Sequence, residues 1–375
     1  MTSSKKPAIL QVLPELNTGG VERGVVDLSI YANTKGYRVI VASQGGKQVV
    51  QLEHAGVEHF LLPLRTKNPL KIIVNILRLK KLIKRENVKL VHARSRAPAW
   101  SAYFAAKSSK VPFITTFHGY YKNNFPGKKI YNSVMAKGEK IIAVSDFIKR
   151  HITSYYGVDE GRITTIHRGV DFNEFDAGKI SDTQIRAFKK THDIENRTVI
   201  LLPGRITRWK GQIIAVRALN YLEDKNAVLV FAGKLNEQNN YSIEIISELN
   251  DNGLMHRAKF LGDVNDMALV YAASDIVLST SVEPETFGRV SAEANMMGKV
   301  VVATNIGGSK EIIVDGKTGF LVEAGQPKIL AEKIDELLLL LKDEKIKQRM
   351  SEDCVLNVKN NFSLEKNVRR YFEII

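Results

Sequence analysis

The sequence has little cysteine and no long apolar run. Cys354 is the only cysteine among 375 residues, so the chain can form no internal disulfide and no cysteine-based metal site. No apolar run approaches the ~20 residues of a membrane span. The N-terminus lacks the long apolar stretch and small-residue cleavage site of a signal peptide. We therefore expect a cytoplasmic protein without a transmembrane helix.

Two common phosphate-binding motifs are also missing. No G-x-G-x-x-G sequence occurs, and no G-x-x-x-x-G-K-[ST] loop. These absences argue against a dinucleotide site and a Walker-type loop.

Positive charge is concentrated in the first half of the chain. Residues 1–173 contain 28 Lys and Arg against 11 Asp and Glu, whereas the whole chain has a net charge of +15. The remainder is therefore close to neutral. This asymmetry predicts an anionic partner for the first half: a membrane surface, a phosphorylated glycolipid or a nucleic acid.

Strand-like and helical runs alternate along both halves, and 375 residues exceed the usual size of a single core. We predict an α/β protein of two Rossmann-like, doubly wound domains that face each other across a cleft. Residues 1–172 would form the first domain, and residues 196–355 would form the second. A C-terminal helix, about 356–375, would pack back on the first domain.

Two carboxylates mark the stretch after the strand-like run 276–279. Glu285 and Glu293 stand eight residues apart, roughly 12 Å along a helix that would begin near Glu285. This is about the span from the sugar to the ribose of a nucleotide sugar. The amides of residues 286–288 would be free donors for phosphate at the helix N-terminus.

A second basic turn follows the strand that begins at Thr198. Arg205 and Lys210 lie five residues apart in it and could hold two adjacent phosphates, Arg by its planar fork and Lys as a point charge. The alternative is a solvated basic loop.

Other polar or glycine-rich turns also follow predicted strands. They are Gly19-Gly20, His118, Ser145 and Gly307-Gly308. Each has a structural alternative: a tight turn, a hydrogen-bonded histidine or a helix N-cap. Since all would lie at the carboxyl edges of parallel sheets, we expect them to border one ligand cleft.

The motifs together resemble the group 1 (family 4) retaining glycosyltransferases of GT-B fold. The resemblance rests on Glu285-x7-Glu293 with Phe287-Gly288, on Gly204-Arg205 with Lys210-Gly211, and more weakly on the glycine turns and His118. The runs 94–100 and 116–120 look like those of members that act on lipopolysaccharide core. Thr286 departs from the usual glycine after the first Glu.

The resemblance implies roles for individual residues. Arg205 and Lys210 would neutralise the leaving diphosphate, Glu285 would contact the donor sugar, and Glu293 the ribose. The first domain would bind the acceptor and place His118 near the reacting sugar, and the second would bind the nucleotide sugar. The expected catalytic set is therefore His118, Arg205, Lys210 and Glu285. The expected donor-binding set is Gly19, Gly20, Phe287, Gly288, Glu293, Leu261 and Gly262.

The expected reaction transfers a sugar from a nucleotide-diphosphate sugar to a membrane-associated glycolipid or polysaccharide, with retention. No Asp-x-Asp pair occurs, so we expect no cofactor and no metal at the diphosphate. The basic amphipathic run 70–85 suits either a solvated outer helix or attachment to an anionic membrane. We therefore expect a peripheral protein on the inner face of the plasma membrane.

Two other classes of function remain open. A nucleotide-sugar epimerase of the same fold would need no acceptor, and the basic first half disfavours it. Charge alone suggests nucleic-acid binding, but no nucleic-acid motif appears, so we expect no nucleic-acid partner.

Overall fold

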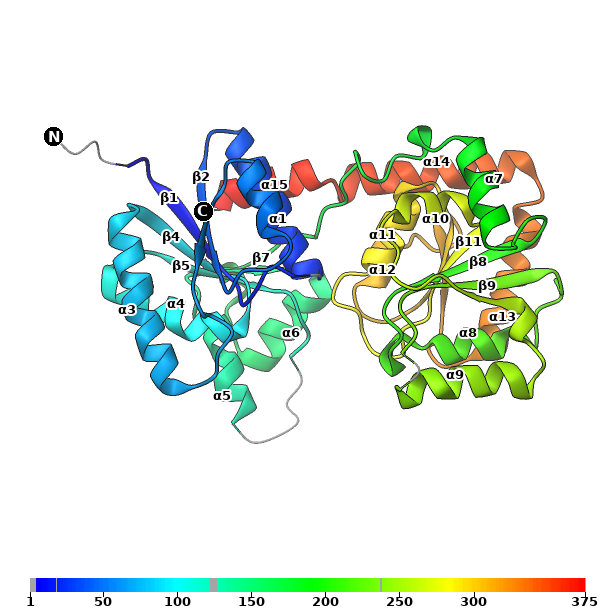
Figure 1. Ribbon diagram of the computed structural model, residues 1–375, viewed down its shortest axis with the longest axis horizontal. Helices are drawn as coiled ribbons and strands as arrows, with labels where there is room; N and C mark the ends of the chain where they lie inside the picture. Colours follow the sequence, from blue (N-terminus) through cyan, green and yellow to red (C-terminus); the bar gives the residue numbers. More distant parts are fainter. Residues whose placement is uncertain (1–4, 18, 122–126, 237, 375) are drawn as a thin grey trace. The chain divides into compact units, whose positions relative to one another are not determined.

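The computed structural model describes residues 5–17, 19–121, 127–236 and 238–374. It divides into two compact units, Met1–Gly169 with Glu365–Ile375, and Val170–Leu364 (Figure 1). None of the described helices is both long and apolar enough to cross a membrane.

Within its described residues, the first unit is built on a seven-stranded parallel sheet. Its order is β3-β2-β1-β4-β5-β6-β7. The strands are β1 (Ala8–Val12), β2 (Arg38–Ser43), β3 (Glu58–Leu61), β4 (Val88–Ala93), β5 (Phe113–Phe117), β6 (Lys140–Ala143) and β7 (Ile163–Thr165). The helices are α1 (Gly20–Thr34), α2 (Val49–His54), α3 (Pro69–Arg85), α4 (Arg96–Ser109), α5 (Lys128–Asn132), α6 (Asp146–Tyr156) and α15 (Leu364–Ile374).

The second unit repeats this plan with a six-stranded parallel sheet among its described residues. Its order is β10-β9-β8-β11-β12-β13. The strands are β8 (Thr198–Pro203), β9 (Ala227–Ala232), β10 (Ala258–Phe260), β11 (Ile276–Ser279), β12 (Val301–Thr304) and β13 (Gly319–Val322). The helices are α7 (Asp182–Thr191), α8 (Gln212–Ala218), α9 (Asn240–Asp251), α10 (Met267–Ala273), α11 (Arg289–Met296), α12 (Ser309–Ile312), α13 (Pro327–Leu340) and α14 (Glu344–Asn361).

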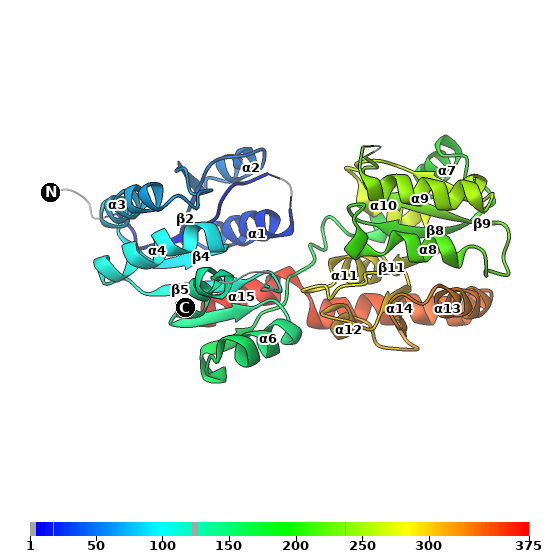
Figure 2. The same cartoon turned by 90° about the horizontal axis from the view of Figure 1, so that it is seen from below.

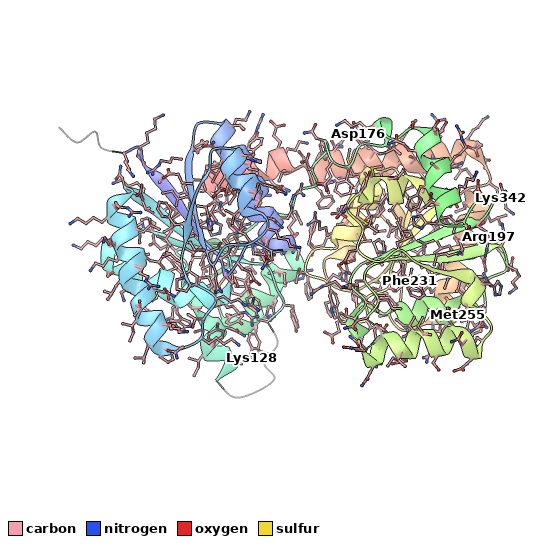
Figure 3. All side chains as sticks on the ribbon, in the orientation of Figure 1. Lys128, Asp176, Arg197, Phe231, Met255 and Lys342 are labelled. Carbon is pink, nitrogen blue, oxygen red and sulfur yellow. The ribbon has the colours of Figure 1, made fainter. Side chains whose placement is uncertain are left out.

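Apolar side chains fill both faces of each sheet, which explains the near-continuous apolar strand sequences. Phe231 on β9 is an example: it lies inside the second unit and stacks on Phe260, with ring centroids 4.7 Å apart (Figure 3). The predicted pair of doubly wound parallel sheets is confirmed.

Each sheet has one point where the strand order reverses. It lies between β1 and β4 in the first unit and between β8 and β11 in the second. In α/β sheets, ligands commonly bind at the carboxyl edge near such a point, because the connections from the two strands lead to opposite faces. These two edges are where the functional side chains are to be sought.

The chain passes between the units at different residues than the sequence suggests. The second unit begins at Val170, so residues 173–195, which lie between the two predicted domains, belong to it. The C-terminal helical segment breaks at Phe362–Ser363: α14 packs on α11 of the second unit, and α15 belongs to the first unit (Figures 1 and 2). Since helical periodicity continues across this break, the sequence pattern alone does not locate it.

Candidate active site

The loop that follows β8 is fixed against the loop that follows β11. Gly211 has φ 68°, and a Cβ there would lie 2.1 Å from the carbonyl oxygen of Thr280, so the close approach requires glycine. The Val282 amide donates to the Trp209 carbonyl at 2.8 Å. The two loops on either side of the switch point therefore form one rigid surface.

Lys210 and Glu285 meet on this surface. The Lys210 ammonium donates to Glu285 Oε1 at 2.7 Å, and both side chains are largely buried. Ser281 Oγ donates to the same carboxylate oxygen at 2.6 Å. The ammonium also lies 4.6 Å from the centre of the Trp209 ring. These contacts hold the cation and the carboxylate in place at the carboxyl edge of the sheet.

Arg205 lies in the same loop but is exposed. Within the described part of the chain its guanidinium has no hydrogen bond or ion pair, whereas the neighbouring Arg208 is paired with Glu244 at 2.6 Å. Arg205 therefore carries a positive charge that no described residue compensates, in the same loop as Lys210.

The helix after β11 begins later than the sequence suggests. α11 starts at Arg289, with Gly288 as its N-cap at φ 94°. A Cβ on Gly288 would lie 2.7 Å from Ser309 Cα. The expectation that the amides of residues 286–288 belong to the helix N-terminus is wrong, because Gly288 adopts a left-handed conformation and breaks the helix there. Glu285 thus lies in a turn, and the estimated 12 Å axial spacing does not apply.

Glu293 lies near the middle of α11 and is buried. Its carboxylate accepts hydrogen bonds from Tyr271 Oη at 3.1 Å and from Arg289 Nε. Burial and the adjacent carboxylate raise the pKa of Tyr271 well above its usual value. The Glu293 carboxylate is therefore held in place by two side-chain partners.

A cavity of about 960 Å³ opens at this edge of the second sheet, a volume sufficient for a ligand of nucleotide size. Its lining comes from the ends of β8, β9 and β10 and from α10 and α11. It includes Gly204, Arg205, Gly233, Lys234, Gly262, Asp263, Tyr271, Val290 and Glu293.

The remaining donor-binding candidates of the second unit differ in their placement. Gly262 lines the cavity, and a Cβ there would meet no atom within 4 Å. Leu261 packs partly on the core, and its amide donates to the Phe231 carbonyl at 2.9 Å. The Phe287 side chain is buried against Phe362, so its ring faces away from solvent.

In the first unit, His118 follows β5 and is almost fully buried. Arg168 Nη2 lies 3.2 Å from its Nδ1. Burial, with Arg94 and Arg168 nearby, holds the pKa of His118 well below its usual value, so the ring is neutral at pH 7. Because Arg168 can only donate, Nδ1 accepts and the proton resides on Nε2, which has no partner among the described residues. His118 therefore presents a free N–H donor.

Gly19 and Gly20 lie at the start of α1 in the same unit. Gly19 is the N-cap, and a Cβ on it would lie 2.2 Å from a carboxylate oxygen of Glu22. The glycine therefore leaves room for Glu22 to cover the helix terminus.

Comparisons with known proteins agree with this arrangement. Residues 18–174 match the model for Glycosyltransferase Family 4, and residues 184–353 match that for Glycosyl transferases group 1. A glycosyltransferase from Rickettsia africae ESF-5 is 38% identical, with a TM-score of 0.91 over 98% of this chain and 97% of that one. The chain belongs to the group 1 glycosyltransferases.

Two more distant structures share the fold of this glycosyltransferase. Anabaena Alr3699/HepE, solved in complex with UDP-glucose, is 22% identical with a TM-score of 0.84 over 98% of each chain. WaaG, a glycosyltransferase involved in lipopolysaccharide biosynthesis, is 15% identical with a TM-score of 0.75, over 98% of this chain and 99% of that one. Both support the GT-B architecture.

The structure of the glycosyltransferase thus brings Arg205, Lys210, Glu285, Gly262 and Glu293 to one sheet edge. Sequence reasoning missed the residues that hold them. Ser281 could have been found, because it lies only two residues after β11. Tyr271 could not, because it lies within α10, far from any strand end.

Proposed function

We propose that the protein is a retaining glycosyltransferase that uses a nucleotide-diphosphate sugar as donor. The observation that carries this proposal is the arrangement at the β8/β11 switch point: exposed Arg205 lies beside the Lys210–Glu285 pair, and Glu293 lines the cavity there. Two cations and two held carboxylates suit a ligand with a diphosphate between two sugars.

In the proposed reaction, the bond between the anomeric carbon and the diphosphate oxygen breaks. The same face of that carbon bonds to the acceptor oxygen, and the acceptor's proton passes to the leaving phosphate. Negative charge grows on the diphosphate as the sugar becomes oxocarbenium-like. Arg205 and Lys210 favour that charge more in the transition state than in the ground state. The proposal assigns no metal to this step.

The carboxylates would then bind the two ends of the donor. Glu285 would accept hydrogen bonds from sugar hydroxyls while it keeps Lys210 in place. Glu293, with Tyr271 behind it, would accept from the ribose hydroxyls. Gly262 would leave room for the base. UDP-glucose in the related fold of HepE supports this class of donor.

The acceptor is proposed to be a membrane-associated glycolipid or polysaccharide of the cell envelope, such as lipopolysaccharide core. The basic first half and the lipopolysaccharide role of WaaG support it. The free Nε2–H of His118 would donate to a sugar oxygen, a role for which the neutral imidazole is suited.

Helix α3 supports peripheral attachment to an anionic membrane. Its most exposed apolar side chains are Leu70, Ile73, Val74 and Leu77, and its exposed basic residues include Lys71, Arg78, Lys81 and Lys84. Exposed apolar side chains next to lysines are typical of a helix that lies in the lipid headgroup region. Co-sedimentation with phosphatidylglycerol vesicles at two salt concentrations tests this attachment.

A panel of nucleotide sugars tests the function. We expect one nucleoside diphosphate and its sugar conjugates to raise the thermal unfolding midpoint, and the conjugate to be consumed with retention, also in EDTA. An epimerised donor without transfer would support an epimerase instead. The absence of any nucleotide response would contradict the proposal.

A further inference from the structure

Arg94 is a buried cation at the carboxyl end of β4. Its side chain is only 6% exposed. Among the described residues it makes no hydrogen bond and no ion pair, and its Nε is enclosed without a partner. Burial lowers the pKa of Arg94 to about 10, which leaves the group charged at neutral pH. A charge held away from water without a counter-ion is costly, so its presence requires an explanation.

The position of Arg94 points to a ligand. The residue lies at the switch point of the first sheet, where its amide donates to the Val12 carbonyl of β1 at 2.9 Å. Its Nη2 lies 3.6 Å from where a Cβ on Gly24 would be, so the guanidinium borders the N-terminal part of α1. That helix has no side-chain cap at Gly19. The Glu22 carboxylate already covers the terminus of α1, so it is the guanidinium that favours an anion at this edge.

Neighbouring side chains add positive charge around Arg94. Arg94 and Arg168 both act on the pKa of His118, so the three side chains lie close together. Arg96, two residues further along, contacts the Tyr121 ring at 4.2 Å and donates to Asn132 rather than to an acid. Glu22 lies against Gly19 at the start of α1 and forms no hydrogen bond or ion pair with Arg94 among the described residues.

We propose that Arg94 is the centre of an anion site that binds a phosphate or carboxylate group carried by the acceptor. An arginine fork matches two oxygens of either group. The second unit already offers Arg205 and Lys210 for the donor's diphosphate, so the site in the first unit is assigned to the other substrate. This inference rests on the proposed function, because it assumes that there is an acceptor.

The test compares full-length wild type with Arg94→Met, Arg94→Lys and Lys89→Met. Lys89 is an exposed residue on the same strand, so its substitution removes one charge without touching the site. Thermal unfolding is followed with and without inorganic phosphate or acetate, at constant ionic strength set with chloride. We expect phosphate near 100 times its Kd to raise the wild-type midpoint by about 5 °C.

The same rise is expected for Lys89→Met. Arg94→Met should show little of it, and Arg94→Lys should bind phosphate at least about tenfold more weakly because it lacks the fork. Without anion, Arg94→Met should unfold at the same or a higher temperature than wild type, since an unpaired buried charge is gone. A purely structural arginine would instead give a lower midpoint and an unchanged phosphate response, which would overturn the site.

A second experiment identifies whether the anion that binds at Arg94 belongs to the acceptor or to the donor. UDP binding is measured by calorimetry for wild type, Arg94→Met and Arg205→Gln. We expect Arg94→Met to bind UDP as wild type does and Arg205→Gln to bind it more weakly. Tenfold weaker UDP binding by Arg94→Met would place the donor's diphosphate at Arg94 and overturn the acceptor assignment. If no variant binds any nucleotide, the proposed function fails, while the phosphate response still decides whether Arg94 holds an anion.

Discussion

Lys210 Nζ lies 2.7 Å from Glu285 Oε1, and this contact joins the loops that follow β8 and β11. The two residues are 75 positions apart in the sequence. Because the carboxylate compensates the Lys210 charge, we expect the exposed Arg205 to be the cation that an incoming diphosphate meets first. Lys210 would contact both Glu285 and the leaving group. It would thus keep Glu285 in place and also stabilise the negative charge on the leaving group.

Arg205→Ala is expected to lower the transfer rate by about 10²- to 10⁴-fold, because it removes a cation from the charge that grows on the leaving group. The unfolding midpoint should stay within about 1 °C of wild type, since Arg205 is exposed and unpaired among the described residues. Rate and midpoint are measured on the same preparation. Arg208→Ala, in the same loop but paired with Glu244, is the matched control and should remain active. Near-normal transfer by Arg205→Ala would contradict the assigned role.

Lys210→Met should lose both activity and stability. It leaves Glu285 as a buried carboxylate with only hydroxyl partners, which we expect to cost about 2–4 kcal/mol in the free energy of unfolding. The double variant Lys210→Met, Glu285→Gln removes both charges and should regain most of that stability while it stays inactive. Denaturant unfolding of the four members of the cycle gives the coupling energy. A coupling energy near zero would show that the pair contributes little to the fold.

Glu293→Ala should weaken nucleotide binding by about 10- to 100-fold, because it removes the acceptor for the ribose hydroxyls. Calorimetric titration with the free nucleotide measures the effect. Tyr271→Phe is the control: it removes one partner of Glu293 but keeps the carboxylate and Arg289. Its affinity should fall only a few-fold. Equal losses in the two variants would assign Glu293 a structural role.

Much of the fold followed from local sequence patterns. Apolar runs such as 198–203 and 227–232 predicted buried strands, and the rule that ligands meet parallel sheets at their carboxyl edges predicted where Arg205 and Glu285 lie. The order of the strands in each sheet could not be predicted from the sequence, because it depends on which strands pair with one another. The switch point between β8 and β11 therefore became visible only in the structure.

Contacts made at a distance were not predictable in the same way. Two of these contacts join residues far apart in the chain: the Lys210–Glu285 pair and the hydrogen bond from Tyr271 to Glu293. That Arg94 lacks a counter-ion among the described residues is likewise visible only once the chain is folded. The start of α11 was misplaced for a local reason. The sequence pattern places Gly288 inside a helical run, but its left-handed φ of 94° ends the preceding turn, so the helix starts at Arg289 and not near Glu285.

Lys299 should make the free energy of unfolding of the second unit change with pH in the alkaline range. Its ammonium donates to the carbonyls of Ala272 and Ser274, and burial lowers the pKa of Lys299 to about 8, against the opposing effect of Asp275. Between about pH 8 and the unfolded pKa of about 10.5, the unfolded chain binds more protons than the folded one, so stability rises with pH across this window. The gain should approach about 2–3 kcal/mol, at about 1.4 kcal/mol for each unit of pKa. Lys299→Met should lose this gain. Denaturant midpoints at pH 7, 9 and 10.5 for both proteins measure the difference; parallel pH profiles would show that Lys299 titrates like an exposed lysine.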